Sequence, residues 1–211
     1  QEKQTNEQEV AAAIKILGQT FIQRWDRYAR QLDDGYVAIK KPLHHHHLEA
    51  HLQGDLTLGT YVLDPDSQGR FMVLDADYEP DGRRLQALAT ILQEWETPSY
   101  LEQSRRGNHL WLFFDSARPA TDIRLFGHGL LNRFRIDTVE LFPKQDRLVS
   151  GPGSLIRLPF GIHRKTNRRY GFVTPEGEPL APTLRAQLQL FERPQTVPKT
   201  VWTRFVEAGR E

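Results

Sequence analysis

Apolar side chains recur at three- and four-residue intervals in several stretches of the chain, a spacing that predicts helices. The first stretch covers residues 7–32 and predicts one helix, or two short helices that are broken near Gly18. A short amphipathic helix is expected at 43–53, and longer ones at 82–95 and 121–134. Each of these helices presents one apolar face to a core.

Between the helices, apolar and β-branched runs predict strands. The run at 57–77 indicates a hairpin whose turn is the sequence DPDSQG. Further strands are expected within 108–114, 137–143, 153–164 and 169–180. Helices and strands therefore alternate along the chain, which favours a mixed α and β class.

Composition narrows the possible classes of protein. The 211 residues are 38% hydrophobic and 26% charged, which is typical of a folded globular protein. A net charge of +1 does not by itself indicate nucleic-acid binding. The absence of cysteine rules out disulfides and thiolate chemistry and suits a reducing interior, so we expect a cytoplasmic protein. No apolar run is long enough to cross a membrane.

Two carboxylates end an otherwise apolar strand, in the sequence RFMVLDADYEP. Residues i and i+2 of a strand share a face, so Asp75 and Asp77 lie side by side, with Cα atoms about 6 to 7 Å apart. Their repulsion is relieved by a divalent cation, and Mg²⁺ or Mn²⁺ prefers such oxygen ligands. The alternative for this pair is a solvated strand end.

A second polar cluster precedes the strand NHLWLFF. His109 stands at the mouth of that strand, as a phosphate contact or as a hydrogen-bonded core histidine. Just before it, Ser104, Arg105 and Arg106 supply a hydroxyl and two guanidinium groups, which are donors that suit phosphate oxygens. The alternative for the arginines is a solvated loop.

A third carboxylate and a basic region follow. Glu140 alternates with Val139 and Leu141, so it points to the opposite face of an extended segment. The basic region is an anion-binding surface or simply an exposed loop. Its members are Arg157, His163, Arg164, Lys165, Arg168 and Arg169.

Taken in order, the segments LDAD, SRRGNHLWLFF, VELFPKQ and LIRLPFGIHRKT resemble the catalytic domain of the archaeo-eukaryotic primase superfamily, the primase-polymerases. The longer signatures, with FIQRWDRYARQL near the N-terminus, are most similar to members from mobile-element, conflict and CRISPR-associated systems. The likeness runs from residue 21 to about residue 180. The segment SRRGNH departs from the commoner pattern, which often has an extra small residue before the histidine.

The resemblance implies roles for particular residues. Asp75, Asp77 and Glu140 correspond to an acidic triad that binds two Mg²⁺ or Mn²⁺ ions, and His109 corresponds to a residue that contacts the phosphates of the incoming nucleotide. Asn108 is expected to set the adjoining loop. The expected contacts to triphosphate and sugar are Ser104, Arg106, Arg157, His163 and Arg164.

The resemblance also implies an α+β fold, in which an RRM-like mixed sheet carries the metal site beside a smaller N-terminal α/β module. We assign residues 1–190 to this catalytic domain, with the N-terminal module at 1–68 and the catalytic module at 69–190. Residues 191–211, which contain two prolines, are expected to form a linker or strap.

Two aromatic residues and a run of four histidines each allow two interpretations. Trp111 and Tyr170 could stack on template bases, but core positions suit both better. The run His44–His47 cannot turn all four imidazoles toward one metal, so a surface role near Lys40 and Lys41 is favoured over structural zinc.

The expected function is template-directed synthesis or extension of primers from nucleoside triphosphates on single-stranded DNA. Three alternatives stay open: a primer-dependent repair or tolerance polymerase, a metal-dependent nuclease, and a binding module with a degenerate site. The expected partners are a template strand, a primer, nucleoside triphosphates, and a fused or associated helicase or CRISPR or defence protein. No membrane partner is expected.

Overall fold

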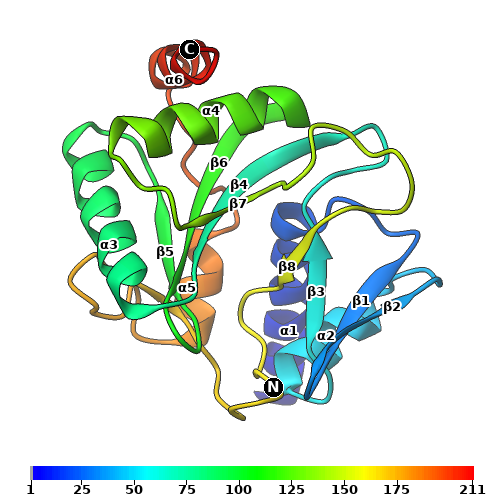
Figure 1. Cartoon of the computed structure of the whole chain (residues 1–211). Coiled ribbons are helices and arrows are strands. Elements are labelled where there is room, and N and C mark those ends of the chain that lie inside the picture. The colour runs from blue at the N-terminus through cyan, green and yellow to red at the C-terminus, as the bar shows by residue number, and fades with distance from the viewer. Residues whose placement is uncertain (1) are drawn as a thin grey trace.

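The computed structural model describes residues 2–211 as two antiparallel sheets and six helices (Figure 1). The helices are α1 (Glu2–Phe21), α2 (His45–Gln53), α3 (Glu79–Glu94), α4 (Ala120–Arg133), α5 (Leu184–Leu190) and α6 (Lys199–Gly209). The strands are β1 (Tyr28–Leu32), β2 (Gly35–Ile39), β3 (Leu58–Tyr61), β4 (Gln68–Ala76), β5 (Tyr100–Gln103), β6 (Asn108–Pro119), β7 (Glu140–Phe142), β8 (Leu155–Arg157) and β9 (Phe172–Val173).

The larger sheet has the strand order β7-β4-β6-β5-β9. Its first four strands follow the chain order β4-α3-β5-β6-α4-β7, a split β-α-β unit of the RRM type. This arrangement confirms the expected α+β class. All pairs of named strands in this sheet are antiparallel, whereas the expectation was a sheet with both parallel and antiparallel pairs.

The smaller sheet has the order β2-β1-β3-β8 and brings together strands from distant parts of the sequence. The expected hairpin over residues 57–77 is wrong, because β3 pairs with β1 and β8 while β4 pairs with β6 and β7. The turn itself exists, since the Asp64 amide donates to the Gln68 carbonyl at 2.8 Å. The two strands then diverge because β4 buries both of its faces inside the larger sheet, between β7 and β6.

Side chains on the two faces of β4 enter separate cores. Met72 and Leu74 join the core under α3 and α4, and these two helices cover one face of the larger sheet (Figure 1). Phe71 and Val73 join the second core, which includes residues of α1, α5 and the smaller sheet. Asp75 has the same alternation as Phe71 and Val73, so it lies on the face toward the smaller sheet.

The N-terminal helix is continuous through Gly18 and ends at Phe21, so the alternative of two short helices is not what the structure shows. Gly18 instead admits a close neighbour: a Cβ atom there would lie 3.0 Å from the ring of Trp25. Trp25 and Tyr28 continue the helical spacing in the sequence, but the helix has ended before them and Tyr28 begins β1.

Residues 191–211, expected as a linker or strap, contain α6, which packs against α4 on the side away from the sheet (Figure 1). The two helices approach closely because glycines face the contact: a Cβ on Gly129 would lie 2.1 Å from the carbonyl oxygen of Phe205. The division into modules at 1–68 and 69–190 stays a prediction. The strand β8 from the later segment completes the sheet of the earlier one.

Candidate active site

Four polar side chains form one row across neighbouring strands of the larger sheet. The register pairs Glu140 of β7 with Asp75 of β4, Asp75 with His109 of β6, and His109 with Glu102 of β5. Directly paired residues project to the same face of a sheet. The sheet therefore places three of the sequence-predicted residues side by side, with Glu102 as an unexpected fourth.

The acidic pair Asp75 and Asp77 is not fully neutralised by its neighbours. Asp75 Oδ1 is buried and has no hydrogen-bond partner, although His109 Nε2 lies 3.3 Å away. Burial, with the nearby charges of Asp75 and Glu140, raises the pKa of Asp77. A buried carboxylate oxygen without a hydrogen bond and a neighbour with a raised pKa are what a site for a hard cation presents.

Glu140 is held differently, because its Oε2 atom lies 2.6 Å from Lys144 Nζ in a half-exposed ion pair. With the side chains so placed, no group of three or more histidine or acidic side chains in residues 3–211 is arranged to hold a metal ion. The donor set suits Mg²⁺ or Mn²⁺, but Glu140 has to leave Lys144 before it can join Asp75 and Asp77 as a ligand.

His109 is buried between two carboxylates. Its Nδ1 atom lies 3.0 Å from Glu102 Oε1, and Nε2 faces Asp75. Burial by itself lowers the pKa of His109, but the two carboxylates outweigh burial and raise it to about 9. His109 is therefore a cation at neutral pH, and it lies between Asp75 and Glu102.

Glu102 was not singled out in the sequence, yet it is a fully buried carboxylate with three partners. Its Oε1 atom accepts hydrogen bonds from His109 and from Trp111 Nε1, each at 3.0 Å, and Arg157 approaches Oε2 at 3.5 Å. The available signal was Glu102 in the short run YLEQ, an acid at the centre of a sheet-forming segment. That signal is weak without knowledge of which strand lies beside it.

The turn between β5 and β6 closes over the end of β4. Two hydrogen bonds join Ser104 and Gly107. The Ser104 amide donates to the Gly107 carbonyl at 3.0 Å, and the Gly107 amide donates to the Ser104 hydroxyl at 3.2 Å. A Cβ on Gly107 would lie 1.8 Å from the carbonyl oxygen of Ala76, so only glycine allows this approach. Asn108 donates to the Gly82 carbonyl at 3.0 Å and ties the turn to α3.

A cavity of about 220 Å³ lies between the two sheets beside this row. The larger sheet contributes Asp75, Asp77 and His109, and the smaller sheet and its loops contribute Arg157 and His163. Ser104, Arg105 and Arg106 form part of its wall. The structure thus gathers most of the sequence-predicted site residues around one polar cavity.

Two basic residues of this cavity are partly or wholly buried. Arg157 is 6% exposed, and its guanidinium approaches Glu102 and lies over the ring of Tyr170 at 5.1 Å. Burial and the positive charge of Arg157 lower the pKa of His163 to about 4. His163 is therefore neutral at pH 7, while Arg157 carries the positive charge at this wall.

Arg164 does not reach the cavity. Its guanidinium donates to the Gly54 carbonyl at 2.8 Å and to Thr57 Oγ1 at 3.0 Å, so it binds the loop before β3. Trp111 is fully buried and Tyr170 is 8% exposed, so neither ring is available for stacking on a base. Both belong to the core, the placement favoured by the sequence.

The histidine run caps a helix. His44 is the N-cap residue of α2, and its amide donates to His47 Nδ1 at 2.9 Å. His47 packs on Tyr28, with ring centroids 4.7 Å apart, and His45 packs on Trp25. These contacts pack α2 against Tyr28 and Trp25, and the surface role near Lys40 and Lys41 stays a prediction.

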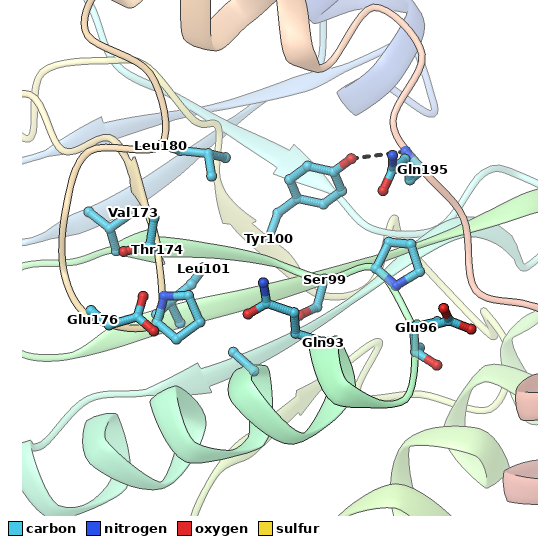
Figure 2. A pocket seen from close by; sticks show the side chains of 14 residues that line it. Gln93, Glu96, Ser99, Tyr100, Leu101, Val173, Thr174, Glu176, Leu180 and Gln195 are labelled. Atoms are coloured by element: carbon cyan, nitrogen blue, oxygen red, sulfur yellow. Dashed lines mark hydrogen bonds between the residues drawn. The ribbon is translucent and has the colours of Figure 1, made fainter.

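A larger cavity, of about 500 Å³, opens at the other end of β5 and is shown in Figure 2. Glu96 and Glu176 line it, and the Tyr100 hydroxyl accepts a hydrogen bond from the Gln195 amide at 2.9 Å. Its lining has no lysine, arginine or histidine. This cavity therefore lacks the positive charge that a phosphate ligand requires.

A comparison with models of protein families shows which family the chain belongs to. Residues 23–197 match the model described as "TOTE conflict system, Archaeo-Eukaryotic Primase domain". The chain belongs to this archaeo-eukaryotic primase family. The matched range includes all the site residues that the motifs predicted, from Asp75 to Arg164. A search of curated proteins finds no match.

Three solved structures are similar to this archaeo-eukaryotic primase domain. The primase-polymerase domain of cyanophage S-2L is 16% identical, with a TM-score of 0.47, and covers 88% of this chain and 97% of its own. The polymerase domain of Mycobacterium tuberculosis Ligase D, in complex with DNA, is 12% identical, with a TM-score of 0.47 and coverages of 96% and 88%. The catalytic domain of primase RepB′, in complex with initiator DNA, is 16% identical, with a TM-score of 0.43 and coverages of 89% and 98%.

Proposed function

We propose that this domain is a nucleotidyltransferase that synthesises or extends primers from nucleoside triphosphates on single-stranded DNA. The observation that carries the proposal is the row of Glu140, Asp75 and His109 in register on three adjacent strands, with Asp77 two residues beyond. Asp75, Asp77 and His109 bring negative and positive groups to one cavity, as a reaction between a triphosphate and a hydroxyl requires.

Asp75, Asp77 and Glu140 are the residues that would hold divalent ions, Mg²⁺ or Mn²⁺. When bound, two such ions lower the pKa of an attacking 3′-hydroxyl and stabilise the charge of the leaving pyrophosphate. The unpartnered Oδ1 atom of Asp75 and the raised pKa of Asp77 support this assignment. Glu140 becomes available when Lys144 releases it.

The cationic residues of the cavity have a separate task. His109 is held through Nδ1 by Glu102, so its Nε2 stays directed toward Asp75 and the cavity. Arg157 of the smaller sheet and Arg106 of the β5–β6 turn bring fixed positive charge to the cavity, where they can bind triphosphate oxygens. Ser104 and His163 are the proposed polar contacts to the remainder of the nucleotide, whereas the position of Arg164 suits a structural role.

The family description suggests a setting for this chemistry. We propose that the domain acts in a conflict or defence system, with a helicase or other defence protein as the associated partner and the cytoplasm as its location. Association with CRISPR systems or mobile elements is part of the same proposal. Among residues 2–211, no helix has both the length and the apolar character that a membrane span requires.

A primer-synthesis assay tests the proposal. The template is circular single-stranded DNA with labelled nucleoside triphosphates and Mg²⁺ or Mn²⁺, and the wild type is compared with Asp75→Ala/Asp77→Ala. We expect labelled oligomers from the wild type without added primer and none from the variant. The matched control is Glu176→Ala/Glu178→Ala, which removes two exposed carboxylates outside the site and should leave synthesis unchanged.

The products distinguish the alternatives. Extension of a primed template without synthesis on unprimed DNA would identify a primer-dependent polymerase. Release of nucleotides from DNA, rather than pyrophosphate from triphosphates, would identify a nuclease. Synthesis that persists in the Asp75→Ala/Asp77→Ala variant would contradict the proposed site, and DNA binding without any reaction would favour a binding module.

A further inference from the structure

The residue after the acidic pair is an exposed aromatic. Tyr78 follows Asp77 at the start of α3. It is 61% exposed, more than any other phenylalanine, tyrosine or tryptophan among residues 3–211. Its side chain makes no capping hydrogen bond to the helix. The ring stands open to solvent beside Asp77 of the proposed active site.

An arginine already lies on this ring. The guanidinium carbon of Arg106 is 5.4 Å from the centre of the Tyr78 ring, and the Arg106 side chain is itself exposed. The contact follows from the backbone, because the close approach of Gly107 to Ala76 brings the β5–β6 turn against the end of β4. Arginine and tyrosine planes arranged in this way are surfaces on which nucleobases stack.

The same turn separates the active-site cavity from a second cavity of about 330 Å³. The second cavity is polar, and its charged lining residues are four arginines and one carboxylate, Glu79. Those arginines are Arg83, Arg105, Arg106 and Arg168. Glu79 forms an exposed ion pair with Arg83 at 3.6 Å, and the lining as a whole keeps a net positive charge, which favours phosphate oxygens.

We propose that a single strand of nucleic acid crosses this surface, with one base stacked on Tyr78 and its backbone phosphates bound by Arg83 and Arg168. The stacking ring and the basic cavity adjoin each other, and this combination is how proteins bind single strands without reading their sequence. The inference rests on the proposed function for the choice of a nucleic-acid strand as ligand, and it adds the path of that strand relative to Asp77.

Fluorescence anisotropy of a labelled oligothymidylate, without divalent ions or nucleotides, measures binding apart from synthesis. We expect Tyr78→Ala to weaken binding about 5- to 150-fold, from the value of one base–aromatic stack. Tyr78→Phe keeps the ring and should stay within about twofold of the wild type. Because each phosphate contact contributes about 0.7 to the salt slope, Arg83→Ala/Arg168→Ala should reduce that slope by roughly 1.4.

The matched control is Arg185→Ala/Arg193→Ala, which removes two exposed positive charges elsewhere and should keep the salt slope. The proposal is overturned if the wild type does not bind the oligonucleotide or if Tyr78→Ala binds as tightly as the wild type. It is also overturned if Tyr78→Ala weakens binding of a nucleoside triphosphate but not of the oligonucleotide, because Tyr78 then serves the incoming nucleotide.

The two proposals can fail separately. If Tyr78-dependent binding is found but the primer-synthesis assay gives no product, the proposed function fails and the single-strand surface stands. If synthesis is found and the oligonucleotide binds equally well without Tyr78 and the two arginines, the surface fails and the proposed function stands.

Discussion

Removal of the Glu102 carboxylate tests whether the row of charged side chains is one interacting unit. Glu102 is fully buried and holds the indole of Trp111, the imidazole of His109 and the guanidinium of Arg157. The substitution Glu102→Ala leaves two cationic groups beside each other without their shared anion. The change is therefore expected to act on stability and on the placement of His109 together.

The size of the effect follows from these contacts. Removing one partner of a buried ion pair typically costs about 3 to 5 kcal/mol, because the remaining charge loses its compensation. Glu102→Gln keeps an oxygen that can accept from His109 and Trp111, but it loses the charge and the oxygen that faces Arg157, so about 1 to 3 kcal/mol is expected. Loss of a group that orients a functional histidine typically lowers activity about 10- to 100-fold.

Urea unfolding monitored by circular dichroism measures the first quantity, and primer extension at saturating template measures the second. Glu94→Ala serves as the control because Glu94 is exposed on α3, and its loss should change the free energy of unfolding by less than about 0.5 kcal/mol. The reasoning is refuted if Glu102→Ala unfolds within about 1 kcal/mol of the wild type. It is equally refuted if folded Glu102→Gln is as active as the wild type.

Three further outcomes are expected. Burial lowers the pKa of His51 to about 4 from 6.5, so the unfolded chain takes up the proton first and His51 should contribute a loss of about 2 kcal/mol in the free energy of unfolding between pH 7 and pH 5 in urea titrations; His51→Gln should lose about 2 kcal/mol less than the wild type over this range. Gly107→Ala should abolish synthesis and lower the melting temperature, because its Cβ would lie 1.8 Å from the Ala76 oxygen; unchanged values would contradict this. Lys144→Ala frees Glu140, so half-maximal synthesis should need up to about fivefold less Mn²⁺, and a higher requirement would disprove the competition.

Much of the site could be predicted from local sequence. The apolar run before Asp75, the histidine at the start of NHLWLFF and the isolated Glu140 each stood out within their own segment. Their order along the chain resembled a known family, and the family match agrees. The segment that misled was 57–77, where two strands joined by a clear turn were expected to pair but entered different sheets.

Glu102 and Tyr78 show what local sequence could not reveal. In YLEQ the glutamate has no distinguishing neighbour, and its importance appears only when β5 lies beside β6 and its register brings it to His109. Tyr78 resembles any aromatic near a helix start until its exposure and its contact with Arg106 are seen. Such contacts join residues many positions apart, so no periodicity records them.

The sequence by itself determined the face that each side chain takes along its own strand, because alternate residues of an extended backbone point in opposite directions. It therefore placed Asp75 with Asp77 and separated Glu140 from its apolar neighbours. Only the tertiary structure decided which strands are adjacent and in what register, because that choice depends on how both faces of β4 are buried together. The row from Glu140 to Glu102 is the result of that packing.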